Sequence, residues 1–131
     1  MALDIPLILD RLNYRYPSLL LDKVVEHVPG ERIVAVKNVT VNEEYFQGHF
    51  PGTPLMPGVM MIETLVQVAA LLLLDDNRES PARRAVLRGV NDAKFRRQVV
   101  PGDRLRLEVT LDQKREEMAI ARGVATVSER T

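Results

Sequence analysis

The feature that most constrains the fold is an almost uninterrupted apolar run of sixteen residues, Val59 to Leu74. Three of its positions are polar: Glu63, Thr64 and Gln67. The run is too short for a membrane span, which needs about 20 apolar residues. A helix this apolar on every side is instead buried by other elements of its domain or by a partner chain. Because Pro57 suits the first helical turn, we predict one long buried helix over about residues 57–75.

A glutamate in such a helix is costly, because an ionised carboxylate leaves water only if it is paired, hydrogen-bonded or neutralised. Glu63 is therefore a candidate acid or base. The alternative is that Glu63 emerges at a gap in the packing and ends a polar network with Thr64 or Gln67. The residue alone leaves both interpretations open.

Length and composition describe an ordinary globular protein. The 131 residues suit one domain, 1–131, and the chain is 46% hydrophobic, 27% charged and of zero net charge, so we expect no nucleic-acid partner. Without cysteine there is no disulfide, thiolate nucleophile or Cys-ligated zinc, and with two distant histidines we expect no metal. The N-terminus lacks a basic region followed by an apolar core, so we expect a cytoplasmic protein without membrane insertion.

The charge is nevertheless uneven along the chain. Residues 83–106 carry 8 basic and 2 acidic side chains, and Arg96 and Arg97 lie within this segment. A basic surface on a neutral protein suggests an acidic partner. The alternative is a solvated strand face whose charges recognise nothing specific.

Turn residues and hydrophobic periodicity predict the remaining elements. They are a short helix over Leu3–Leu12 with Pro6 near its start, a hairpin of Leu19–Val28 and Arg32–Val41, a helical turn over 42–47, and strands over Ala85–Phe95, Leu105–Asp112 and Met118–Val127. One apolar helix with about five strands predicts an α+β fold in which a curved antiparallel sheet wraps the helix.

The helix is preceded by a corner rich in proline and glycine, and His49 opens it. An imidazole and a carboxyl group together can move two protons in one reaction, which suits His49 and Glu63. The N–H of Gly58, at the helix start, could polarise a thioester or ketone oxygen. These groups suit a dehydration in which a base removes a proton next to a carbonyl and an acid assists departure of a β-hydroxyl. The alternative is that His49 is an ordinary loop residue and that Pro57 and Gly58 only mark the start of a helix.

At these residues the sequence resembles the FabZ-type 3-hydroxyacyl-[acyl carrier protein] dehydratases of bacterial fatty acid synthesis. The matching segments are Arg15-Tyr16-Pro17 with Leu19-Leu20-Leu21-Asp22, Phe46-Gln47-Gly48-His49-Phe50-Pro51-Gly52, Met56-Pro57-Gly58-Val59, Ile62-Glu63, Gln67, Lys94-Phe95-Arg96-Arg97 and Val99-Val100-Pro101-Gly102-Asp103. They span most of the chain in the family's order. Three positions depart from it, because Tyr14, Ser18 and Ala70 stand where the family often has His, Phe and Gly.

The resemblance implies a hot-dog fold and a homodimer whose two sites lie at the subunit interface, with such dimers commonly assembling into hexamers. It implies that (3R)-3-hydroxyacyl-acyl carrier protein is dehydrated to the trans-2-enoyl form. His49 of one subunit would be the base, Glu63 of the other the acid, and the Gly58 N–H the donor to the thioester oxygen.

The resemblance also implies that no metal or redox cofactor is used. The acyl chain would arrive on the phosphopantetheine of acyl carrier protein, an acidic partner that suits docking at Arg96 and Arg97. Family members usually continue into another strand beyond the position of Thr131, so either the sequence is shortened there or the sheet closes differently. Two other functions stay open: a hot-dog acyl-thioesterase, and a non-catalytic module that binds acyl thioesters or the carrier protein.

Overall fold

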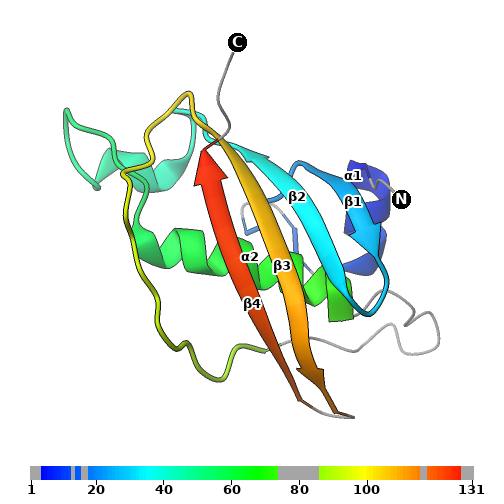
Figure 1. Ribbon diagram of the computed structural model, residues 1–131. Helices are drawn as coiled ribbons and strands as arrows, with labels where there is room; N and C mark the ends of the chain where they lie inside the picture. Colours follow the sequence, from blue (N-terminus) through cyan, green and yellow to red (C-terminus); the bar gives the residue numbers. More distant parts are fainter. Residues whose placement is uncertain (1–3, 13, 16–17, 74–85, 116–117, 128–131) are drawn as a thin grey trace.

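The computed structural model describes residues 4–12, 14–15, 18–73, 86–115 and 118–127. Its elements, in chain order, are α1 (Ile5–Arg11), β1 (Lys23–Val28), β2 (Arg32–Asn38), the 3-10 helix η1 (Glu44–Gln47), α2 (Gly58–Leu73), β3 (Arg104–Lys114) and β4 (Ala119–Val127). The strands form one antiparallel sheet in the order β1-β2-β3-β4, and α2 lies across one face of it (Figure 1). The predicted α+β arrangement of a long helix against an antiparallel sheet is confirmed.

The core lies between α2 and the two central strands. On β3, Leu105, Leu107 and Val109 are buried and alternate with more exposed polar residues, as the period-2 pattern predicts. Ala35 of β2 pairs with Leu107, so apolar side chains from both strands reach the same face. They join one hydrophobic cluster with the buried part of α2, which also receives side chains from α1. Burial on this one face fixes the register of the sheet.

Burial of α2 changes along its length. Its buried residues are Thr64, Gln67, Val68, Ala70, Leu71 and Leu72, whereas Val59 in the first turn is 71% exposed. The other elements of one chain therefore bury only part of α2, and burial of the rest by a partner chain stays a prediction. No helix within the described residues is long and apolar enough to cross a membrane. The predicted end of the helix at 74–75 lies outside those residues.

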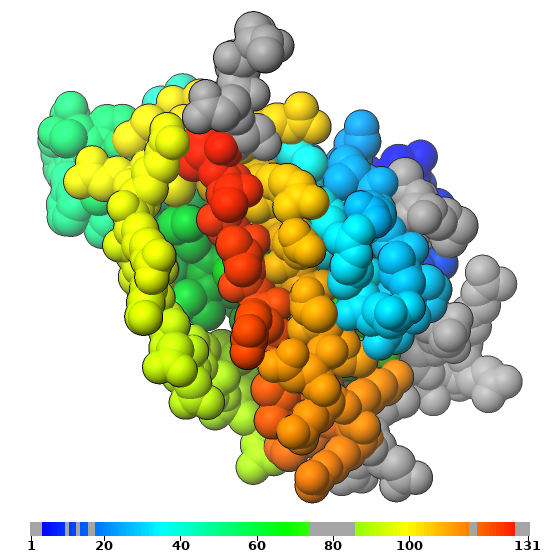
Figure 2. Space-filling model, in the orientation of Figure 1, coloured from blue at the N-terminus to red at the C-terminus, as the bar shows by residue number. Residues whose placement is uncertain are grey.

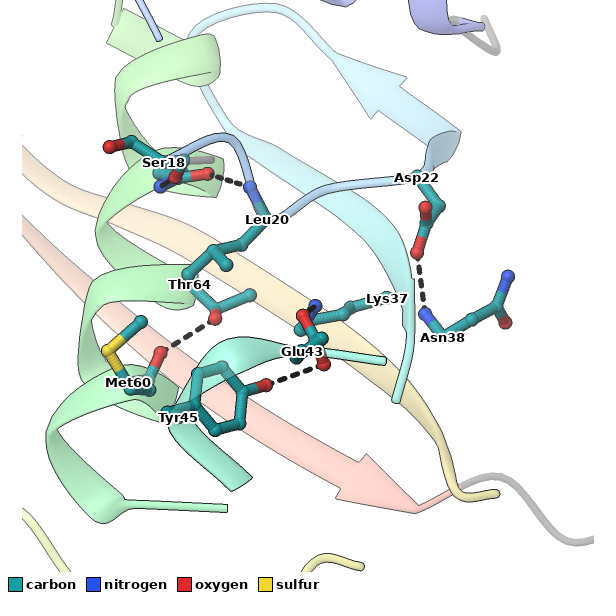
Figure 3. Close-up of polar contacts among 10 residues, drawn as sticks. Ser18, Leu20, Asp22, Lys37, Asn38, Glu43, Tyr45, Met60 and Thr64 are labelled. Carbon is teal, nitrogen blue, oxygen red and sulfur yellow. Dashed lines mark hydrogen bonds and ion pairs between the residues drawn. The ribbon is translucent and has the colours of Figure 1, made fainter. Parts of the chain in front are cut away.

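A charged cluster fastens η1 to the sheet. Lys37 lies on the core-facing side of β2, and its Nζ is 2.6 Å from Oε1 of Glu43, which precedes η1. The hydroxyl of Tyr45, within η1, donates to Oε2 of Glu43 at 2.6 Å (Figure 3). Burial first, and then Glu43, raise the pKa of Tyr45 above its ordinary value. The cluster connects the sheet to the segment that leads into His49.

The main error of the sequence prediction is the strand over Ala85–Phe95. Residues 86–95 form no strand, and their apolar side chains, among them Val86 at 79% and Phe95 at 56%, are exposed. The pattern correctly detects an apolar, branched segment, but a strand also needs a hydrogen-bonding neighbour. The described part of the chain provides none for it. Arg83 and Arg84 of the basic segment lie outside the described residues.

The other predicted elements are present with shifted ends. The hairpin, the helical turn and the last two strands are confirmed as β1 with β2, η1, β3 and β4. The N-terminal helix begins at Ile5, with Pro6 in its first turn, where the missing N–H of proline breaks no hydrogen bond. The predicted start of this helix at Leu3 lies outside the described residues.

Candidate active site

Residues 48–57 form a tight corner between η1 and α2. Phe50 and Thr53 exchange two main-chain hydrogen bonds, with N–H to carbonyl distances of 3.1 and 2.9 Å. The N–H of Met56 donates to the carbonyl of Val99 at 2.8 Å, which ties the corner to the segment before β3. The prolines and glycines of this stretch thus shape a fixed corner.

The corner holds the ring of His49 in one orientation. Nδ1 of His49 lies 2.8 Å from the carbonyl oxygen of Leu55, whose N–H in turn donates to the His49 carbonyl at 2.9 Å. The ring stacks on Phe50 with a centroid distance of 4.0 Å, and the peptide between the two residues is cis. Because a carbonyl oxygen only accepts, Nδ1 carries the proton, and Nε2 of the neutral ring keeps a free lone pair. His49 is therefore in the tautomer that a base at Nε2 requires.

Gly58 is the first residue of α2. The N–H groups of Met60 and Met61 donate to the carbonyl of Pro57, at 3.0 and 3.2 Å, while the Gly58 N–H has no acceptor within the described chain. The ring of Phe95 lies against Gly58, since a Cβ placed on the glycine would be 3.0 Å from two ring carbons. A free N–H at the positive end of a helix can polarise a carbonyl oxygen.

The carboxylate of Glu63 is partly exposed and belongs to a polar network. Gln67 is fully buried, and its Nε2 donates to Oε2 of Glu63 at 3.0 Å and to the carbonyl of Ser18 at 2.7 Å. Its Oε1 accepts from the N–H of Leu20 at 2.8 Å. The polar network considered as the alternative for Glu63 thus exists with Gln67. Thr64 takes no part in it, because its hydroxyl donates to the helix carbonyl four residues earlier.

The charge of the same carboxylate also acts on Tyr14. Burial first, and then Glu63, raise the pKa of Tyr14 above its ordinary value. Sequence reasoning identified Tyr14 only as a departure from the family pattern and gave it no role, whereas it named Gln67 as a possible partner of Glu63. The spacing of four residues on a helix brings Gln67 to Glu63, whereas no local pattern connects Tyr14 to them.

The predicted site residues are only partly brought together in one chain. His49 and Gly58 lie at the two ends of the same corner. In the part of the chain that the structure describes, no hydrogen bond or ion pair joins His49 to Glu63. Arg96 and Arg97 are exposed on the segment that precedes β3.

With this geometry in place, comparison with known proteins shows the family. The model of the FabA-like domain matches residues 12–131, so the chain belongs to that family. A solved structure, "The Dehydratase Heterocomplex ApeI:P from Xenorhabdus doucetiae", matches with a TM-score of 0.74 and 17% identity, covering 92% of this chain and 80% of that one. At this identity the likeness concerns the fold alone, and the predicted hot-dog fold is confirmed.

Three relatives found by sequence comparison are named 3-hydroxyacyl-[acyl-carrier-protein] dehydratase FabZ. The Enterococcus faecalis protein is 52% identical over 128 residues, which is 98% of this chain and 90% of that protein. The Ligilactobacillus salivarius protein is 50% identical over 125 residues, 95% and 89% of the two chains. The Myxococcus xanthus protein is 47% identical over 126 residues, 95% and 82%. The chain belongs to the FabZ-type dehydratases and is an enzyme of the hydro-lyase class.

Proposed function

We propose that the protein dehydrates (3R)-3-hydroxyacyl-acyl carrier protein to the trans-2-enoyl thioester in fatty acid biosynthesis. Nε2 of His49 takes the α-proton, the Cβ–O bond breaks as the double bond forms, and Glu63 protonates the departing hydroxyl to give water. The N–H of Gly58 holds the thioester oxygen, which carries negative charge while the α-proton leaves. No electrons are exchanged, so the proposed reaction uses no redox cofactor, and these groups supply its proton transfers without a metal.

The observation that carries this proposal is the hydrogen bond from Nδ1 of His49 to the Leu55 carbonyl, 2.8 Å long. It keeps Nε2 unprotonated in the neutral ring, which a base needs and a merely structural histidine does not. Glu63 supports the proposal because Nε2 of Gln67 donates to its Oε2 at 3.0 Å, and the side chain stays partly accessible.

Hydration of a trans-2-enoyl thioester, followed as loss of the enoyl absorbance, tests the reaction in reverse. His49→Ala and Glu63→Gln should each stay folded and lose at least about 100-fold in rate, the usual scale for a positioned acid or base. Release of free thiol without loss of the enoyl group would instead identify a thioesterase. Carrier binding without turnover by the wild-type protein would identify a binding module, and either result would overturn the dehydratase.

We further propose that the active unit is a homodimer in which His49 of one chain faces Glu63 of the other. Two observations support this arrangement. His49 and Glu63 share no bond within the described chain, and the apolar segment 86–95 is exposed. Figure 2 also shows atoms of α2 between β4 and this segment, so part of the helix surface is open on this side. A second copy of the chain would cover both this helix surface and the apolar segment 86–95.

Mixing two inactive variants tests the shared sites. In a random mixture of His49→Ala and Glu63→Gln chains, half of the dimers are mixed, and each mixed dimer has one intact site, so activity should recover to about a quarter of wild type. A mixture as inactive as its components, after verified exchange of subunits, would refute shared sites. Sedimentation of the wild-type protein separates a dimer from a trimer of dimers.

We also propose that Arg96 and Arg97 help to dock the carrier protein. Both are exposed, they lie one to two residues beyond Phe95, and the ring of Phe95 contacts Gly58, so the docked carrier would stand close to the site. The double charge reversal to Glu should weaken carrier binding and reduce its salt dependence. Lys23→Glu, an exposed charge reversal at the start of β1, is the matched control. If the double reversal and Lys23→Glu bind the carrier protein equally well, Arg96 and Arg97 are solvated surface charges that recognise nothing specific.

A further inference from the structure

A fully buried glutamine, Gln67, lies about one helical turn beyond the candidate acid Glu63 on α2. Its Nε2 donates to the Ser18 carbonyl at 2.7 Å, and its Oε1 accepts from the Leu20 N–H at 2.8 Å. A flipped amide would set N–H against N–H and oxygen against oxygen, so the amide has one orientation. The second hydrogen of Nε2 then points to Oε2 of Glu63, 3.0 Å away. One oxygen of the acid is thus held by a donor that cannot accept its proton.

The segment that holds this amide is anchored to the sheet. Leu20 is buried, and Asp22 follows two residues later. The N–H of Asp22 donates to the carbonyl of Val36 on β2 at 3.0 Å, and its Oδ2 accepts from the N–H of Asn38 at 2.6 Å (Figure 3). A chain of hydrogen bonds and short main-chain links therefore runs from β2 to the amide of Gln67. The orientation of that amide is set by the packed protein before any substrate arrives.

We propose that Gln67 is a positioning residue for the acid Glu63, and that Oε1, the oxygen that its amide does not contact, carries the proton for the departing hydroxyl. This inference rests on the proposed dehydration. A carboxyl group rotates about its last bond and can carry its proton on either oxygen. A fixed donor at Oε2 removes most of these states in advance, which lowers the entropic part of the barrier.

The hydrogen bond from Gln67 also grows stronger during the reaction. As the Cβ–O bond breaks, its electron pair stays on the departing oxygen, which takes the proton from Oε1 and leaves as water. Glu63 becomes a carboxylate, and the hydrogen bond from Nε2 to Oε2 becomes a charge-assisted one, which is about twice as strong as a neutral one. Because this interaction strengthens toward the transition state, its loss should lower kcat and leave KM nearly unchanged.

A double-mutant cycle tests the proposal through kcat and KM of wild type, Gln67→Met, Glu63→Gln and the double variant. Gln67→Met keeps the volume and should lower kcat about tenfold, the scale of one hydrogen bond to a charged group. KM should stay within about twofold, because the amide binds no part of the substrate. In the Glu63→Gln background the same change should cost less than about twofold, because Gln67 acts through that carboxyl. An equal loss in both backgrounds, or no loss in the wild-type background, would overturn the proposal.

Val109→Ala is the matched control for lost stability. Val109 is buried on β3 and pairs with Ile33 and Gly123, away from the hydrogen bonds of Gln67. Like Gln67→Met, it should lower the unfolding temperature, but it should leave kcat within about twofold of wild type. A kcat loss as large as that of Gln67→Met would mean that both changes act through general destabilisation, and would count against a role for Gln67.

A second measurement needs neither turnover nor a folded Gln67 variant. In a proton–nitrogen correlation spectrum the side-chain amide of Gln67 gives two signals, one from the hydrogen that faces Ser18 and one from the hydrogen that faces Glu63. Glu63→Ala removes the acceptor of the second hydrogen alone, so its signal should move upfield further than the first, which is the internal control. Equal shifts, or none, would refute the contact. An inactive wild-type protein would refute the proposed dehydration but leave this test standing, so the two failures are distinguishable.

Discussion

The buried ion pair between Lys37 and Glu43 gives the sharpest prediction about stability. The two charged atoms are 2.6 Å apart, and the side chains are only 4% and 19% exposed. Glu43→Ala would leave the Lys37 ammonium on the core face of β2 without its carboxylate. Removing one partner of a buried pair typically costs about 3–5 kcal/mol, because the remaining charge stays out of water. We expect a loss of this size in the free energy of unfolding.

The loss translates into a large shift of the unfolding temperature. Unfolding entropy is about 2.1 cal/mol/K per residue near 60 °C, so for 131 residues about 3–5 kcal/mol corresponds to a decrease of about 10–18 °C. The hydroxyl of Tyr45 loses its acceptor on Glu43 as well, which adds about 1 kcal/mol. Calorimetry and urea unfolding, at a pH where the wild type is two-state, measure both quantities.

Two further variants decide whether burial is the cause. Asp112→Ala removes a carboxylate 3.8 Å from Arg122 in a pair whose side chains are 42% and 76% exposed, and should cost less than about 1 kcal/mol. The double variant Lys37→Met with Glu43→Leu removes both buried charges and should be close to wild type. A Glu43→Ala protein as stable as Asp112→Ala, or a double variant as unstable as Glu43→Ala, would refute the reasoning.

Two more predictions concern the site. Gly58→Ala places a methyl group 3.0 Å from the ring of Phe95, so we expect a folded protein whose kcat is about tenfold lower. Adding Phe95→Leu should partly restore kcat. An unchanged kcat in Gly58→Ala would contradict close packing at the helix start. Gln67→Met keeps the volume but leaves the Ser18 carbonyl and the Leu20 N–H without a partner, which should cost about 2–4 kcal/mol in urea unfolding. A cost below about 1 kcal/mol would mean that water replaces the amide.

The sequence predicted the elements whose pattern is local. The apolar run with Pro57 before it located α2 to within a residue at its start, and the alternation through Leu105, Leu107 and Val109 located β3. Turn residues placed the hairpin of β1 and β2. These features depend on periodicity and on dihedral preferences, both of which can be read from neighbouring residues. The exposure of Val59 could not be read in this way, because it depends on what covers the helix.

In the candidate site, too, the sequence predicted what is local and missed what depends on packing. The Pro/Gly-rich corner and its histidine are contiguous, so His49 and Gly58 were found from the sequence. Tyr14 was not, because the effect of Glu63 on its pKa exists only once the segment after α1 packs with α2 on the same core. The amide of Gln67 makes that packing specific, since it bonds the segment after Tyr14 to α2. A buried polar network of this kind joins residues distant in sequence, and no local pattern encodes it.

Two features of the single chain point to the same missing neighbour. Residues 86–95 have the composition of a strand but no hydrogen-bonding partner in the described chain, and Glu63 is held by the Gln67 amide but has no base beside it within the described residues. Either fact alone has a local explanation, such as an irregular connection or a structural carboxylate. Together they are accounted for by one further element, a second copy of the chain, which would cover the apolar segment and bring His49 to Glu63. A monomer with full activity at all dilutions would therefore remove the common explanation for both, and it would require a different base for the reaction.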